Sequence, residues 1–273
     1  MQIQTIKTAS GLFRVRLDGP ADAPVLVFSN SLGTTLDMWD AQAAHFATDY
    51  RVVRYDTRGH GGSEVSTGPY SFGQLGGDVV ALLDALEIAR ASFCGISMGG
   101  LTSLWLGIYA GERFDRLAVC NSAARIGSAE GWLTRAAMVR EQGGAAMIEL
   151  AGSSSSRWFT EAFAATQPAI VSTAKGWIAG IAPKGYAACC EALAHADLRS
   201  AINSIKLPTL LIAGTSDPVT TVADANAMQQ AIANSRVVEV PASHLSNLEA
   251  PAQFNEALAV FLRADTQSTQ QRA

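Results

Sequence analysis

Residues 94–100 read Cys-Gly-Ile-Ser-Met-Gly-Gly, and this stretch decides the fold. Its G-x-S-x-G pattern lies between a short β-prone run and a run at residues 101–109 that is apolar at helical spacing. A strand, a sharp turn and a helix in that order form a nucleophile elbow, which holds its central serine above a sheet. The turn strains the backbone of Ser97, and Gly95 and Gly99 lack the Cβ atoms that would keep strand and helix apart. The pattern therefore predicts that Ser97 is a nucleophile.

The rest of the chain alternates β-prone and helix-prone runs, as a parallel sheet built from β-α-β units requires. It opens with a predicted hairpin, at residues 3–8 and 12–17. We expect buried strands at residues 25–28, 51–55, 91–94, 117–120, 207–214 and 236–240, and helices at residues 39–46, 74–86, 101–109, 222–233 and 251–262. The sequence therefore predicts an α/β fold with a mostly parallel sheet flanked by helices.

The alternation stops at residues 124–203, which are alanine-rich, helix-prone and without a strand pattern. Glycines, prolines and a serine run at residues 153–156 divide this segment into about four helices, and we expect the serines to connect two of them. An insertion before the last two strands would lie over the carboxyl ends of the sheet, where such sheets bind ligands. We therefore predict a core of residues 1–123 and 204–273 and a helical lid, or cap, of residues 124–203.

Composition limits the partners. The 273 residues are 48% hydrophobic, enough for a sizeable core, and their net charge of −4 favours neither nucleic acid nor an anionic membrane surface. No apolar run is long enough to span a membrane, and the first residues lack the apolar core of a signal peptide. The four cysteines lie in apolar segments without the spacing of a zinc site or a disulfide framework. We expect a cytoplasmic protein that binds a small molecule and no metal.

A serine hydroxyl needs a general base, and the base needs a carboxylate that holds its tautomer. In this architecture the acid and the histidine follow the serine in the chain, each after a core strand. Asp217 follows the predicted strand at residues 207–214, and His244 follows the strand at residues 236–240. We therefore predict a catalytic triad of Ser97, Asp217 and His244.

Other residues compete weakly for these roles. The acid can also follow the strand that precedes the insertion, but that position holds Asn121, whose amide cannot carry charge. We expect His60 to shape the glycine-rich loop in which it lies, and His45 and His195 to be surface or packing residues.

Acyl transfer also needs two N–H donors that stabilise an oxyanion. One is the amide of Met98, at the amino terminus of the elbow helix. The other should come from the loop after the strand at residues 25–28, where we assign the amide of Leu32. We expect the neighbouring Ser31 hydroxyl to contact the substrate.

Six short stretches resemble a known family. Residues 56–61 (Asp-Thr-Arg-Gly-His-Gly) and 95–100 (Gly-Ile-Ser-Met-Gly-Gly) are typical of the whole α/β-hydrolase superfamily, which the chain resembles over its full length. Within it, the chain is similar to the 3-oxoadipate enol-lactonases. The stretches that match these enzymes are residues 30–34 (Asn-Ser-Leu-Gly-Thr), 123–127 (Ala-Ala-Arg-Ile-Gly), 157–160 (Arg-Trp-Phe-Thr) and 244–247 (His-Leu-Ser-Asn). The arginine-containing stretches in and beside the lid are the more specific.

The resemblance implies ring opening of 3-oxoadipate enol-lactone to 3-oxoadipate in aromatic catabolism, through an acyl-enzyme on Ser97 and without a metal or cofactor. The substrate carries a carboxylate, so we expect a cation near the lid to orient this anionic lactone. The possible cations are Arg135, Arg157 and Arg125, and we expect Trp132 to form an apolar wall over the ring.

Two other functions remain open. The same triad serves broader esterases, perhydrolases and carbon–carbon bond hydrolases, whose specificity differs through the lid. A non-catalytic ligand-binding protein on this fold is the least favoured reading, because all three triad residue types are present.

Overall fold

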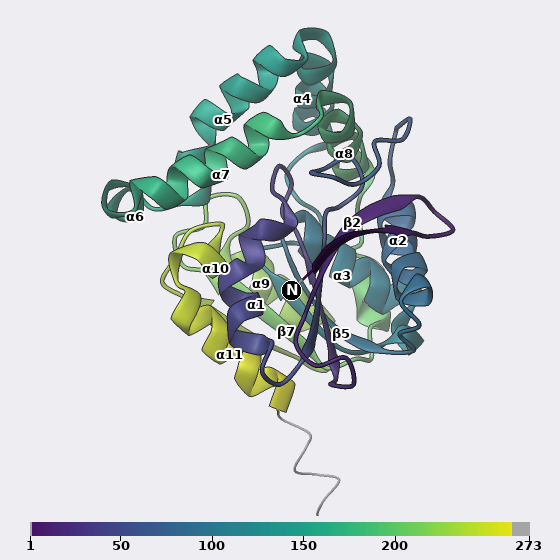
Figure 1. Cartoon of the computed structure of the whole chain (residues 1–273). Coiled ribbons are helices and arrows are strands. Elements are labelled where there is room, and N and C mark those ends of the chain that lie inside the picture. The colour runs from purple at the N-terminus through teal and green to yellow at the C-terminus, as the bar shows by residue number, and fades with distance from the viewer. Residues whose placement is uncertain (1, 264–273) are drawn as a thin grey trace, which may run out of the picture.

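The computed structural model describes residues 2–263, and an eight-stranded sheet runs through its centre (Figure 1). The strand order is β1-β2-β4-β3-β5-β6-β7-β8. Only the β1–β2 and β2–β4 pairs are antiparallel, and the other pairs are parallel. The strands are β1 (Gln2–Lys7), β2 (Leu12–Asp18), β3 (Val25–Ser29), β4 (Arg51–Tyr55), β5 (Ala91–Ile96), β6 (Phe114–Cys120), β7 (Thr209–Gly214) and β8 (Ser235–Val240). The predicted mostly parallel sheet is confirmed.

Helices cover both faces of the sheet. On one side, α1 (Asp40–Phe46) packs against α11 (Pro251–Arg263), and on the other α2 (Phe72–Ala85) packs against α3 (Met98–Tyr109) (Figure 1). The remaining core elements are α9 (Val222–Ala231), α10 (Ser246–Glu249), η1 (Leu36–Trp39), η2 (Gly111–Arg113) and η3 (Ile202–Ser204). Every residue of β7 is buried, as expected for a central strand with helices on both faces.

Five helices are inserted between β6 and β7, one more than the sequence suggested. They are α4 (Ala129–Gln142), α5 (Gly144–Trp158), α6 (Glu161–Thr166), α7 (Pro168–Gly180) and α8 (Pro183–His195). As predicted, Gly143 separates the first two, and Pro168 and Pro183 begin later helices. Proline has no N–H group, which is harmless in the first turn of a helix because an N–H there has no partner within the helix. We call α4–α8 the helical insertion; it lies above the core in Figure 1.

The prediction for the serine run is wrong: residues 153–156 lie inside α5 and connect nothing. Their hydroxyls bond back to the helix itself, Ser153 to the Leu150 carbonyl at 3.3 Å and Ser154 to the Ala151 carbonyl at 2.8 Å. Serine in mid-helix is tolerated when its hydroxyl is satisfied in this way. Ser154 also faces the interior, so packing of the insertion overrides a weak local preference.

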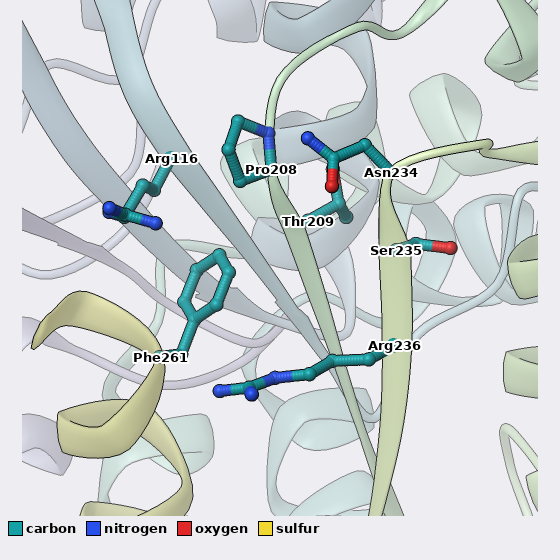
Figure 2. Close-up of a pocket in the computed structure, with 7 residues that line it drawn as sticks. All are labelled: Arg116, Pro208, Thr209, Asn234, Ser235, Arg236 and Phe261. Atoms are coloured by element: carbon teal, nitrogen blue, oxygen red, sulfur yellow. The ribbon is translucent and has the colours of Figure 1, made fainter. Parts of the chain in front are cut away.

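A cavity of about 280 Å³ opens at the amino ends of β6, β7 and β8 (Figure 2). There the guanidinium groups of Arg116 and Arg236 each lie 5.5 Å from the ring centre of Phe261. Its described lining contains no histidine, cysteine or carboxylate, so it offers no general base. Among residues 2–263, no helix combines the length and the apolar character needed to cross a membrane.

Candidate active site

The turn between β5 and α3 has the strained geometry of a nucleophile elbow. Ser97 has φ +57° and ψ −113°, a conformation that non-glycine residues rarely adopt. A Cβ atom at Gly95 would collide with the Gly99 carbonyl, and one at Gly99 would collide with the Ser29 carbonyl. Glycine at both positions lets strand and helix approach closely enough to present Ser97 above the carboxyl end of β5.

His244 and Asp217 form a buried pair. The Nδ1 atom of His244 lies 2.8 Å from Asp217 Oδ2, and the residues are 2% and 5% exposed. The carboxylate also accepts hydrogen bonds from the amides of Val219 (2.8 Å) and Thr220 (3.1 Å). Burial raises the pKa of Asp217, but His244 and these hydrogen bonds outweigh it and leave the pKa below its ordinary value. Because the acid is ionised, the shared proton sits on Nδ1, and Nε2 is free to act as a base.

Asn121 holds this pair to the sheet. It directly follows β6 at φ +42°, and its Nδ2 atom donates to Asp217 Oδ2 at 3.0 Å and to the Ser243 carbonyl at 3.1 Å. Its Oδ1 atom accepts a hydrogen bond from Ser246. The sequence excluded Asn121 as the acid but did not reveal that its amide would support the acid and the histidine loop.

Ser97 and His244 face one cavity of about 140 Å³ between the carboxyl ends of the strands and the helical insertion. The core supplies loops after β3, β5, β7 and β8, and the insertion supplies α4, α5 and α8. The lining residues are Ser31, Leu32, Ser97, Ile126, Gly127, Trp132, Arg135, Arg157, Trp158, Tyr186, Val219 and His244. Seven of the predicted site residues therefore meet in one small cavity: Ser31, Leu32, Ser97, Trp132, Arg135, Arg157 and His244.

Two cations and an indole form the wall that belongs to the insertion. The guanidinium of Arg135 lies over the Trp132 ring, 4.9 Å from its centre, as expected for residues three apart on a helix. The indole N–H of Trp132 donates to the Ile126 carbonyl at 2.6 Å, which fixes the ring. Burial and the nearby Arg135 lower the pKa of Arg157. The described lining contains no carboxylate, so these cations favour an anionic ligand.

Arg125, one of the three cations proposed for the substrate carboxylate, lies outside this cavity. Its neighbour Ile126 faces the cavity, whereas Arg125 forms an ion pair of 3.7 Å with Asp197. It lines a separate surface hollow together with Arg199 and Met228.

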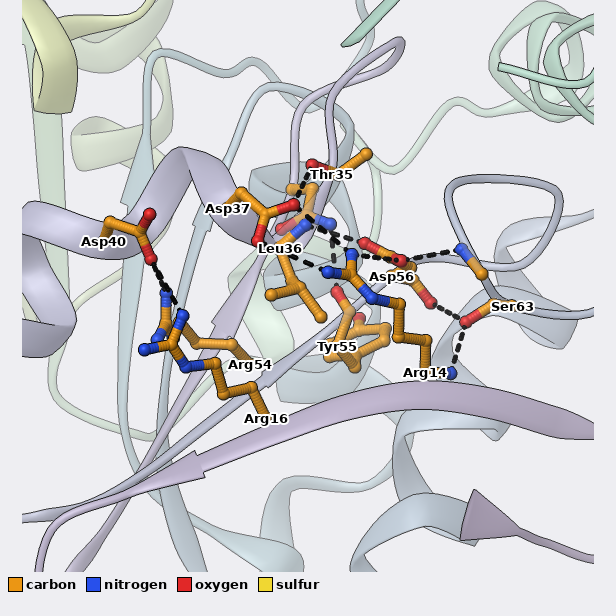
Figure 3. A network of polar contacts seen from close by, with 12 residues as sticks. Arg14, Arg16, Thr35, Leu36, Asp37, Asp40, Arg54, Tyr55, Asp56 and Ser63 are labelled. Carbon is orange, nitrogen blue, oxygen red and sulfur yellow. Dashed lines mark hydrogen bonds and ion pairs between the residues drawn. The ribbon is translucent and has the colours of Figure 1, made fainter. Parts of the chain in front are cut away.

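The loop that carries Leu32 is held by Asp56 (Figure 3). Asp56 Oδ1 accepts from the amide of Leu36 at 2.7 Å, and Oδ2 forms an ion pair of 3.1 Å with Arg14. Burial raises the pKa of Asp56, and these contacts offset part of that rise. At the elbow, the Met98 amide is the first of α3 and so has no acceptor within its helix. Leu32 therefore lines the same cavity as Ser97, and the Met98 amide begins the helix that directly follows Ser97.

His60 lies in the glycine-rich loop that it was expected to shape, and it also braces the loop that carries Leu32, a contact that the sequence did not reveal. Its Nε2 atom accepts the Gly33 amide at 3.0 Å, and its Nδ1 atom lies 3.3 Å from the Arg58 carbonyl. This arrangement requires the neutral ring, and complete burial lowers the pKa of His60 to about 4. A neutral histidine therefore holds Gly33, the residue after Leu32.

We expect His60 to make the free energy of unfolding depend on pH between about 6.5 and about 4. The unfolded chain has the higher histidine pKa, about 6.5, so the unfolded state takes up the proton first as the pH falls. The stability contributed by neutral His60 is complete above about pH 6.5 and is lost toward about pH 4, a change of about 3 kcal/mol.

The check compares denaturation midpoints of the wild type and His60→Gln at about pH 7.5 and about pH 4.5. Glutamine can still accept the Gly33 amide but does not titrate, so the variant should lose less stability on acidification. Equal losses in the two proteins would contradict the assignment.

Other lining residues escaped sequence analysis. Ile126 and Gly127 precede α4, and Trp158 follows Arg157 in a stretch already noted for its resemblance. Val219 stands two residues after the predicted acid, a spacing that was a usable signal. Tyr186 offered none, because its place in α8 acquires meaning only when α8 packs beside α4. Burial raises the pKa of its phenol, which therefore stays neutral.

A strained serine that faces the same cavity as an acid-bound histidine is the arrangement of serine hydrolases on an α/β sheet. The comparisons agree: a model of the alpha/beta hydrolase fold family matches residues 24–251. 3-oxoadipate enol-lactonase 2 of Acinetobacter baylyi is 50% identical over 245 residues, 90% of this chain and 91% of the relative. 3-oxoadipate enol-lactonase 1 of the same organism is 46% identical and covers 92% of each chain.

Solved structures give the same result. The enol-lactonase of Burkholderia xenovorans superposes with a TM-score of 0.92 at 44% identity, covering 95% of this chain and 99% of that one. A thermophilic esterase from Thermogutta terrifontis, with malate bound, has a TM-score of 0.89 at 25% identity, covering 97% and 99%. The chain therefore belongs to the α/β-hydrolase family and, within it, to the 3-oxoadipate enol-lactonases.

Proposed function

We propose that this protein opens 3-oxoadipate enol-lactone to 3-oxoadipate in the catabolism of aromatic compounds. The observation that carries the proposal is one small cavity that contains the elbow serine, the acid-bound histidine and two guanidinium groups. The lactone is a small ester with one free carboxylate, which matches this set of groups. The names of the two Acinetobacter relatives support the same substrate. We also assign the protein to the cytoplasm, where its four buried thiols would stay reduced.

In the first half of the reaction, the Oγ atom of Ser97 attacks the lactone carbonyl while His244 Nε2 takes the proton from the serine hydroxyl. The amides of Leu32 and Met98 hold the oxyanion of the tetrahedral intermediate. The ring carbon–oxygen bond then breaks, and the enol oxygen receives the proton from His244. The enol becomes a ketone, so ring opening yields a poor nucleophile that does not reverse the step.

In the second half, His244 removes a proton from water as the water attacks the acyl-enzyme on Ser97. The bond to Oγ breaks, His244 returns the proton to Oγ, and 3-oxoadipate leaves with its new carboxylate. Asp217 stabilises the imidazolium in both halves without taking up the proton.

The helical insertion serves as the lid in this proposal, with residues 124–203 over the described part of the core, residues 2–123 and 204–263. Three of its helices contribute cavity walls: α4, α5 and α8. We assign Arg135 and Arg157 to the substrate carboxylate, Trp132 to the ring and the Ser31 hydroxyl to a polar contact with the lactone. Arg125 has no part in this assignment because it lies outside the cavity.

The decisive experiment follows the decay of enol-lactone absorbance with purified protein, alongside a panel of p-nitrophenyl esters. Rapid opening of the lactone with slow ester cleavage supports the proposal. The reverse order would favour a broader esterase that uses the same triad.

Replacing Arg135 by methionine should raise KM for the charged lactone about tenfold or more, because a charge-assisted contact of roughly 1.5–3 kcal/mol is lost. KM for a neutral ester should stay nearly constant. Arg125→Met is the matched control, since it makes the same change outside the cavity. If KM for both substrates is unaffected by Arg135→Met, then Arg135 does not bind the carboxylate.

A further inference from the structure

Glu249, the last residue of α10, joins the helical insertion to the loop that carries His244. Its Oε2 atom accepts the amide of Ser243 at 2.9 Å. Both carboxylate oxygens lie 3.3 Å from the amide of Thr160, and the Thr160 hydroxyl also donates to Oε1. One carboxylate therefore holds the residue before His244 and a residue between α5 and α6.

Two further contacts join the same two segments, one after His244 and one before it. The amide of Leu245 donates to the Trp158 carbonyl at 3.0 Å. The Ser243 hydroxyl points at the Arg157 carbonyl from 3.5 Å. The chain is thus tied to residues 157–160 both before and after His244, and α10 lies below this end of the insertion in Figure 1.

These residues of the insertion also form the cavity wall, because the side chains of Arg157 and Trp158 line it together with His244. Beside the junction lies a second cavity of about 520 Å³, bounded by Phe159, Thr160, Pro218 and Ser243 among others. The hydrogen bonds of Glu249 and of the Leu245 amide join residues 157–160 to the histidine loop beside this cavity.

We propose that Glu249 is a positioning residue, which sets the place of His244 relative to the wall formed by residues 157–160 of the insertion. The inference rests on the proposed roles of Ser97 and His244 as nucleophile and base. Asp217 holds one end of the imidazole, but the backbone of the histidine loop determines where Nε2 points. A misplacement of about 1 Å in such a group can cost about 10²-fold in rate.

The test measures the rate at which a fluorophosphonate probe labels Ser97, together with kcat and KM for the enol-lactone. In Glu249→Ala we expect labelling and kcat to fall about tenfold, and in Glu249→Gln by a smaller factor, because the amide keeps one acceptor. In Thr160→Val the labelling rate and kcat should fall about threefold. Thr160→Ser keeps the hydroxyl, so both values should stay near those of the wild type. Glu249→Ala with Thr160→Val should be no slower than Glu249→Ala alone, because both act through one contact.

Glu161→Gln is the matched control, since Glu161 is an exposed carboxylate next to Thr160 with no contact to the histidine loop in the described residues. All rates are taken well below the melting temperature of each variant, so that lost stability does not mimic lost reactivity. Wild-type labelling rates in Glu249→Ala, with or without a lowered melting temperature, would overturn the positioning role. A wild-type protein that resists the probe would instead overturn the proposed nucleophile, and the positioning role with it. If the wild-type protein is labelled but does not open the lactone, only the proposed substrate is wrong, and the positioning role of Glu249 still stands.

Discussion

Ser97→Ala is expected to lower kcat for the enol-lactone by a factor on the order of 10³ or more. The variant retains the cavity, the arginines and the two assigned amides, so substrate still binds. It loses the only atom placed to form the acyl-enzyme, and water would have to attack the ring directly. Ser97 is strained at φ +57°, but alanine is no more strained there than serine, so the fold should persist.

The measurement is single-turnover decay of the lactone with the purified variant and an unchanged melting temperature. Ser156→Ala is the matched control, because Ser156 is exposed on α5 and lies outside the cavity lining. Turnover of Ser97→Ala close to that of the wild type would remove the nucleophile from the mechanism.

Asp217→Asn should reduce kcat by about 10⁴ while KM changes little. The carboxylate accepts hydrogen bonds from His244, Asn121 and the loop amides at once. An amide has only one oxygen, so its NH₂ group must face some of these donors. The histidine would then favour the tautomer with the proton on Nε2, which cannot accept the serine proton.

A matched surface variant separates this mechanism from simple unfolding. Asp22→Asn makes the same chemical change at an exposed residue and should keep full activity. If Asp217→Asn is folded and retains more than about a tenth of wild-type kcat, the carboxylate is not the group that orients His244. The acid would then have to be sought elsewhere in the structure.

The elements that sequence analysis located best are those with strong local patterns. Continuous apolar runs marked β3 and β7, and the G-x-S-x-G turn marked the elbow within a residue or two. The errors lie where local preference is weak. The serine run belongs to α5 because buried Ser154 and the packing of α5 against α7 outweigh the modest cost of serine in a helix.

Within the site, chain order and strand ends were enough to select Ser97, Asp217 and His244. Helical spacing placed Arg135 beside Trp132. Contacts between segments far apart in the chain depend on tertiary packing and not on chain order or helical spacing, so the ion pair of Arg125 with Asp197 could not be predicted from the sequence.

Sequence alone determined the α/β fold, the order of its elements, the strained serine and the one acid and one histidine that follow it at strand ends. These follow from steric limits and from apolar periodicity, which act over a few residues. Only the tertiary structure decided that Asn121 supports the acid, that Tyr186 lines the cavity and that Glu249 ties the insertion to the histidine loop. Each of these depends on groups separated by tens of residues, whose meeting is set by how the insertion and the loops pack on the sheet.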